Sequence, residues 1–125
     1  MPSCKSLVVA GLIGAAAATG EYTIDSTTRT FRDSSNRVRI FHGMNVVVKL
    51  PPYLPTDGDF NYEMSINDQD LKYMKNWGVN LVRLGVMWEA VETSPGYYDM
   101  NYLDAVENLI NRFGNDGITV IVDNH

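Results

Sequence analysis

Three basic side chains in this sequence stand within or just after runs of apolar residues. Lys49 follows the run from Met44 to Val48, Arg83 interrupts LVRLGV, and His125 ends TVIVDNH. Ammonium, guanidinium and imidazole groups donate hydrogen bonds to carboxylates and hydroxyls. Lys49, Arg83 and His125 are therefore candidate functional residues.

Arg83 and His125 each leave alternatives open. An unpaired charge inside an apolar strand is costly to bury, so Arg83 must meet a carboxylate. That carboxylate is either a catalytic one or a core acid such as Asp123. His125 could bind substrate hydroxyls, ligate a metal or make a structural contact. Because His42 is the only other histidine, we expect no metal site in this chain.

Helices are predicted between the apolar runs. Asn67 is a candidate N-cap for a helix of about ten residues that ends at Gly78. Asp99 can cap a second helix, which Gly114 would close. One face of that second helix is apolar, with the spacing of three and four residues that buries a helix face: Leu103, Val106, Leu109, Ile110 and Phe113.

The predicted order of elements indicates an α/β fold. Residues 44–48, 81–86 and 118–122 are expected to form strands that are buried on both faces. A β-hairpin around Asp33-Ser34-Ser35-Asn36 precedes them, and its second arm is expected to continue into the first of these strands. Strands of this kind that alternate with helices form a parallel sheet.

Two parallel architectures fit this order, a doubly wound sheet and the first part of a (β/α)8 barrel. The doubly wound sheet would carry a glycine-rich phosphate turn after its first strand, whereas this chain has Lys49-Leu50-Pro51-Pro52 there. Without such a motif, no cofactor is expected. A complete barrel needs about 250 residues. Residues 21–125 are therefore expected to be a truncated barrel domain, with about three βα units after the leading hairpin.

The first twenty residues differ in composition from the rest. Lys5 precedes an apolar stretch from Leu7 to Ala18, which is the layout of a secretory signal peptide over residues 1–20. A disordered or membrane-grazing terminus is the alternative. We expect a secreted or lumenal protein. The formal net charge of −5 argues against a nucleic-acid partner, because no basic patch is available to neutralise phosphates.

The motifs after these elements resemble a known family. GVNLVRLGVMWEAVE, PGYYDMNYLDAVENLINRF and GITVIVDNH together resemble the N-terminal third of glycoside hydrolase family 5 enzymes, over about Thr27 to His125. The segment NVVVKLPPYLP is similar to the endoglycoceramidase branch of that family. Members of this branch cleave the β-glycosidic bond between a sugar and ceramide.

The resemblance implies a (β/α)8 barrel that hydrolyses β-glycosides with retention. Its two catalytic glutamates would lie on strands four and seven, beyond His125, so no catalytic residue is expected in this chain and the chain alone is expected to be inactive. Arg83 and His125 would support the catalytic site. Lys49, His125 and Trp88 would bind substrate, which is expected to be a glycolipid or an oligosaccharide.

Other residues near these motifs have more than one possible role. Trp88 could stack on a sugar ring or pack beneath a loop. Glu89 and Glu92 are interpreted as loop or rim residues rather than catalytic ones. The loop Pro51–Pro55 could present an apolar lip to a lipid tail at a membrane surface, or simply be a rigid turn.

Two other functions remain compatible with the sequence. One is a non-catalytic barrel protein that binds carbohydrate or lipid through Lys49, Arg83 and His125. The other is a metal-dependent barrel hydrolase in which His125 is a ligand.

Overall fold

The computed structural model describes residues 22–125. The predicted signal peptide, residues 1–20, lies outside this part. Along the chain the elements are β1 (Thr23–Ile24), β2 (Phe31–Arg32), β3 (Val38–Arg39), β4 (Gly43–Val46), α1 (Asp68–Asn76), β5 (Leu81–Val86), α2 (Trp88–Val91), β6 (Glu92–Ser94), β7 (Tyr97–Tyr98), α3 (Met100–Asn115) and β8 (Thr119–Asn124).

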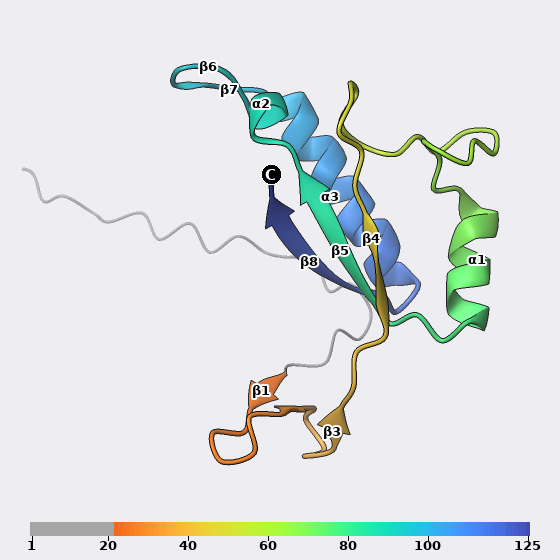
Figure 1. Cartoon of the computed structure of the whole chain (residues 1–125), viewed down its shortest axis with the longest axis vertical. Helices are drawn as coiled ribbons and strands as arrows, with labels where there is room; N and C mark the ends of the chain where they lie inside the picture. The colour runs from red at the N-terminus through yellow and green to blue at the C-terminus, as the bar shows by residue number, and fades with distance from the viewer. Residues whose placement is uncertain (1–21) are drawn as a thin grey trace, which may run out of the picture.

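The centre of the fold is a three-stranded parallel sheet in the order β4-β5-β8. Arg83 lies opposite Asn45 on one side and opposite Ile121 on the other. Figure 1 shows α3 packed along one face of this sheet, while α1 lies beside β4. This arrangement of parallel strands and connecting helices confirms the predicted α/β class.

The core lies between the sheet and α3. Val82, Leu84 and Phe113 have no exposed surface, and Ile118 has 1%. Alternate residues of a strand point to opposite faces, so Val82 and Leu84 face the helices while Arg83 faces the other side. The opposite face of the sheet has no covering layer among residues 22–125.

Both predicted N-caps are present. The side chain of Asn67 accepts from the backbone N–H groups of Gln69 and Asp70, and the Asp70 carboxylate accepts from the backbone N–H of Asn67. Asp99 accepts from the N–H groups of Asn101 and Tyr102. These contacts are local in sequence, which is why the cap residues could be recognised.

The predicted end of the second helix was wrong. Gly114 is buried inside α3, which continues to Asn115. Gly117, with a φ of 75°, is the residue that adopts the left-handed conformation after the helix. A glycine is favoured there because a side chain would strain the backbone.

The hairpin around Asp33 is confirmed, but its second arm does not continue into the central sheet. Among the strands of residues 22–125, β3 pairs only with β2, which also pairs with β1 in a separate antiparallel sheet. β4 begins at Gly43 and ends at Val46, rather than spanning 44–48. A Cβ at Gly43 would lie 2.7 Å from the carbonyl oxygen of Leu81, so Gly43 permits close contact between β4 and β5.

The expectation that all strands are buried on both faces was also wrong. Ile121 is 52% exposed and Val122 is 53% exposed. Because these two residues point to opposite faces of β8, both faces of the strand are partly exposed. Within residues 22–125, β8 forms one edge of the central sheet and its pairing with β5 is its only strand pairing. β8, the third strand of the central sheet, is therefore apolar in sequence but is not covered by other elements among residues 22–125.

Candidate functional site

A hollow of about 460 Å³ lies at the carboxyl ends of the central strands. It is lined by Lys49, Met87, Trp88, Glu89 and His125. The structure therefore brings together the three residues that the sequence suggested for substrate binding. The carboxyl ends of parallel strands meet at one edge of a sheet, which explains why residues far apart in sequence gather here.

Backbone hydrogen bonds hold the floor of this hollow. The N–H of His125 donates to the carbonyl of Val86 at 3.0 Å, and the N–H of Trp88 donates to the carbonyl of His125 at 2.8 Å. The first residue of α2 is thus fixed directly against the end of β8. Trp88 keeps 53% of its surface exposed, so its ring is accessible to a ligand.

Gly85 makes room for the imidazole of His125. A Cβ at this position would lie 2.9 Å from Cγ1 of Val47 and 3.1 Å from Cδ2 of His125. Contacts this short require the neighbouring side chains to move. The glycine in β5 therefore determines where the His125 ring can sit.

Arg83 joins the site through Asp123. Nη2 of Arg83 lies 2.6 Å from Oδ2 of Asp123, and Nε2 of His125 lies 2.8 Å from the same oxygen. Neither contact has the geometry of a directed hydrogen bond, so the buried Oδ2 is held by proximity to these groups rather than by an aligned donor. Arg83 does contact the acid that the sequence suggested as a core partner.

The guanidinium of Arg83 is not buried. Its side chain is 43% exposed on the open face of the sheet, where it lines a second hollow of about 270 Å³ with Asn45 and Leu81. A further carboxylate could therefore reach it. The alternative role, orienting a catalytic carboxylate, stays a prediction, because the described residues include no such group beside it.

The loop after β4 is fixed by the hydroxyl of Tyr102. This hydroxyl accepts from the N–H of Met87 and donates to the carbonyl of Tyr53, each at 3.3 Å. Burial raises the pKa of Tyr102 above its usual 10.0, and the hydrogen bond from the N–H of Met87 opposes this effect. Leu54 packs into the core, whereas Leu50 is 70% exposed. The loop is thus anchored as a turn and also presents one apolar side chain.

Tyr53 and Glu89 form a pair beside the hollow. Hydrogen bonding to the Glu89 carboxylate raises the pKa of the Tyr53 hydroxyl above its usual 10.0, and desolvation and the charge of Glu89 add to this effect. Tyr53 also has a φ of 63°, an uncommon conformation for a residue with a side chain. Its side chain is therefore placed by the turn and by Glu89 together.

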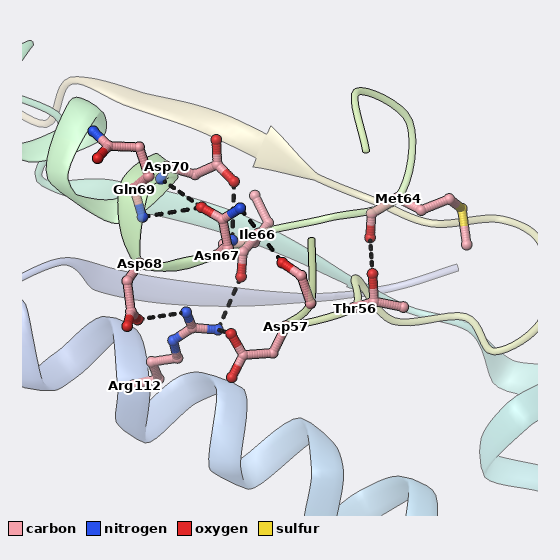
Figure 2. Close-up of polar contacts among 10 residues, drawn as sticks. Thr56, Asp57, Met64, Ile66, Asn67, Asp68, Gln69, Asp70 and Arg112 are labelled. Atoms are coloured by element: carbon pink, nitrogen blue, oxygen red, sulfur yellow. Dashed lines mark hydrogen bonds and ion pairs between the residues drawn. The ribbon is translucent and has the colours of Figure 1, made fainter. Parts of the chain in front are cut away.

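Farther from the hollow, Arg112 of α3 braces the long loop that leads to α1. Its guanidinium contacts Asp57 and Asp68, each at 2.8 Å, and donates to the carbonyl of Ile66 at 2.9 Å. Figure 2 shows these three contacts converging on the one side chain. Arg112 lines, with Pro52 and Leu54, an outer groove of about 550 Å³.

Among residues 22–125, no cluster of three or more histidine, cysteine or acidic side chains is arranged to hold a metal ion. In the same residues, no helix has the length and apolarity needed to cross a bilayer.

The sequence matches a known enzyme family over most of the described part. Residues 41–125 match the family Cellulase (glycosyl hydrolase family 5). The chain belongs to glycosyl hydrolase family 5. The resemblance that the strand-end motifs suggested is therefore confirmed.

Several family 5 proteins that match this chain are named endoglycoceramidases. The endoglycoceramidase of Cyanea nozakii is 32% identical over 103 residues, which are 82% of this chain and 20% of that protein. Endoglycoceramidase I of Rhodococcus hoagii is 33% identical over 93 residues, 74% of this chain and 18% of that protein. The chain thus spans about a fifth of the length of these relatives.

Solved structures confirm the partial barrel. Endo-glycoceramidase II from Rhodococcus sp. superposes with a TM-score of 0.58 at 30% identity, over 74% of this chain and 20% of that one. An endogalactoceramidase superposes with a TM-score of 0.61 at 19% identity, over 81% of this chain and 22% of that one, which supports the fold. The three parallel strands are part of a family 5 (β/α)8 barrel.

Some residues around the hollow were not identified from the sequence. Met87 was missed, and so was Tyr53, whose hydroxyl interacts with Glu89. Glu89, which was interpreted as a loop or rim residue, forms part of the wall. Glu92 accepts from the N–H of Gly96 at 2.6 Å within the β6–β7 hairpin. The hairpin itself had a signal, because Pro95-Gly96 is a turn dipeptide between two short β-prone runs.

Proposed function

We propose that this chain is the N-terminal part of a longer family 5 glycosidase that hydrolyses glycolipids with retention, as an endoglycoceramidase would. The observation that carries the proposal is the hollow that gathers Lys49, Trp88 and His125 at the carboxyl ends of barrel strands. The relatives add the substrate class. They are named endoglycoceramidases, and one solved structure is described as a ganglioside GM3 complex.

The hollow has the groups that a sugar head group requires. The ammonium of Lys49 donates to hydroxyls, and the imidazole of His125 can donate or accept. The face of Trp88 can stack on a pyranose ring. Each of these three groups would contact the substrate without taking part in bond cleavage.

Bond cleavage would need two carboxyl groups about 5 Å apart, one protonated and one ionised. We propose that both belong to glutamates on later strands of the longer protein. Arg83 would then hold the nucleophilic glutamate ionised, because a fixed guanidinium favours the charged form. Export through residues 1–20 completes the proposal and stays a prediction.

The first experiment determines the coding sequence past His125 from messenger RNA. An Asn-Glu pair at the end of a fourth strand supports a glycosidase. A complete barrel without the two glutamates would instead indicate the non-catalytic binding protein, and paired histidines on barrel strands would indicate the metal-dependent hydrolase.

The second experiment measures turnover of the longer protein after Arg83→Ala. We expect turnover of a labelled glycosphingolipid to fall by at least about a hundredfold, because loss of one group that stabilises charge in the site costs that much. Arg83→Lys is the matched variant and should recover only part of the rate, since lysine lacks the two-pronged guanidinium. A near-normal rate in Arg83→Ala would mean that Arg83 only supports the core through Asp123.

A further inference from the structure

The hollow at the strand ends has two walls, which come from segments that are far apart in the chain. Lys49 lines one wall, and Met87, Trp88 and Glu89 at the start of α2 line the other. We call residues 49–53 the first wall and residues 87–89 the second wall. The spacing between the two walls determines which chemical group fits between them.

A turn hydrogen bond closes the first wall. The N–H of Tyr53 donates to the carbonyl of Leu50 at 2.7 Å. Leu54, the residue that follows, is buried in the core and holds the far end of the turn. Because the turn is closed, a displacement of Tyr53 also displaces the backbone next to Lys49.

The second wall has two backbone anchors. The N–H of Trp88 donates to the carbonyl of His125 at 2.8 Å, and the N–H of Met87 donates to the hydroxyl of Tyr102 at 3.3 Å. Met87 is only 6% exposed, and within residues 22–125 this hydroxyl is the acceptor for its N–H. A buried amide that loses its acceptor is costly, so the hydroxyl matters for the position of the second wall.

Tyr102 joins the two walls through a single oxygen atom. Its hydroxyl accepts from the N–H of Met87 and donates to the carbonyl of Tyr53. The side chain comes from the first turn of α3, where Asp99 accepts from the N–H of Tyr102 at 3.1 Å. Figure 1 shows α2 beside the start of α3, at the same end of the sheet as the tips of β5 and β8. The capped start of α3 therefore fixes a hydroxyl between the walls.

A side-chain contact connects the walls at a second point. The hydroxyl of Tyr53 is hydrogen-bonded to the carboxylate of Glu89, which raises the pKa of Tyr53 above its usual 10.0. Burial raises the pKa of Tyr102 as well. Both hydroxyls therefore carry their protons at neutral pH and can donate hydrogen bonds.

We propose that Tyr102 is a positioning residue, whose hydroxyl sets the spacing between the first and the second wall. Tyr102 is not one of the residues that line the hollow, so it acts on a ligand only through the walls. Closely packed interiors transmit small displacements, which is why one hydroxyl can affect both segments. The effect on a sugar substrate rests on the function proposed above, whereas the spacing of the walls does not.

Hydrogen exchange in the full chain tests this role, with nuclear magnetic resonance as the measurement. Tyr102→Phe keeps the buried ring and removes only the hydroxyl. We expect the amides of Met87 and Tyr53 to exchange at least about tenfold faster in this variant, because each wall loses its contact with the other. Packing of the ring alone would leave both rates unchanged.

Two controls separate this effect from a general loss of stability. Tyr62→Phe is the matched variant, since Tyr62 is 84% exposed in the loop before α1, and it should leave both rates unchanged. The amide of Thr119 donates to the carbonyl of Asn80 at the opposite end of the sheet. It should keep its exchange rate in Tyr102→Phe.

Kinetics of the longer protein measure the effect on the substrate. We expect Tyr102→Phe to raise the KM for a labelled glycosphingolipid at least about fivefold and to change kcat by less than about twofold. The reason is that the walls would contact the substrate in the ground state and in the transition state alike. A lower kcat with an unchanged KM would mean that Tyr102 acts on the catalytic groups instead, and would contradict the proposal.

Three exchange results would also overturn the proposal. These are an unchanged rate at Met87, a faster rate at Met87 without one at Tyr53, and an equal acceleration at Thr119. The last result would show that the hydroxyl stabilises the whole fold rather than the spacing of the walls. If the exchange rates change as expected but the longer protein hydrolyses no glycolipid, the positioning role stands and the proposed enzymatic function fails.

Discussion

At the scale of single residues, the shared oxygen of Asp123 explains how Arg83 and His125 are held. The guanidinium of Arg83 and the imidazole of His125 both approach Oδ2 within 2.8 Å, but the Arg83 side chain is 43% exposed. An ion pair with so much exposure contributes at most about 1 kcal/mol to stability. This cluster therefore contributes little to the stability of the fold, but it fixes the positions of Arg83 and His125 relative to each other.

The Tyr53–Glu89 pair gives a prediction for Glu89→Gln. The substitution weakens the hydrogen bond that holds the hydroxyl protonated and removes the charge repulsion, while desolvation remains, so the pKa of Tyr53 should fall part of the way toward its usual 10.0. Absorbance at 295 nm as a function of pH measures this, with Tyr53→Phe identifying which part of the titration belongs to Tyr53. A Tyr53 pKa that does not change in Glu89→Gln would show that the carboxylate does not hold the hydroxyl.

Some residues of the hollow could be predicted from the sequence, because the carboxyl ends of parallel strands meet at one edge of a sheet. Lys49, Trp88 and His125 follow strand-forming runs, and parallel strands deliver such residues to one edge. Tyr53 could not be found in this way, because its position depends on a left-handed backbone conformation and on a contact with α2. Such contacts join segments that are far apart in the chain, and no local sequence pattern indicates them.

At the scale of elements, Arg112 connects α3 to the loop before α1. Arg112→Met should loosen the loop at 57–66, because Asp57, Asp68 and the Ile66 carbonyl each lose their contact with the guanidinium. We expect a loss of about 1 kcal/mol of local stability, since the acids are largely exposed and the carbonyl contributes one hydrogen bond.

Hydrogen exchange of amides in the 57–66 loop measures this effect. The N–H of Thr56 and that of Ile66, which bond to Met64 and Thr56 respectively, are suitable reporters. Arg112→Lys is the matched control and should preserve part of the protection through its charge. Unchanged exchange in Arg112→Met would mean that the Asn67 cap and the turn hydrogen bonds hold the loop without the arginine.

Elements with local signals were predictable, and those that depend on long-range contacts were not. Asn67 and Asp99 marked the helix starts because a cap residue satisfies the amides just after it. By contrast, α2 and the β6–β7 hairpin are short, and the boundary of β4 is determined by its contact with β5. The end of α3 was misplaced because two glycines, Gly114 and Gly117, lie close together and only their conformations distinguish them.

At the scale of the whole molecule, the core is one-sided. Side chains between the sheet and α3 are buried, whereas the other face keeps Arg83 and Ile121 exposed. In a closed barrel that face would be the interior, filled by side chains from the other strands. The barrel class could therefore be predicted from the sequence. The prediction that the third strand is buried on both faces failed, because covering that strand needs further strands and helices.

The free edge of β8 gives the last prediction. The N–H groups of Thr119 and His125 donate toward β5, so alternate amides, those of Val120, Val122 and Asn124, point away from it. In the 125-residue chain these three amides should exchange at least about tenfold faster than those of Ile121 and Asp123. In the longer protein of the proposed function they should become protected, because a fourth strand would accept their hydrogen bonds.

Nuclear magnetic resonance measures the exchange rates of these amides in the 125-residue chain and in the longer protein. Equal protection of the two sets in the 125-residue chain would contradict a free edge, and protection that rises with protein concentration would show that a second copy pairs there.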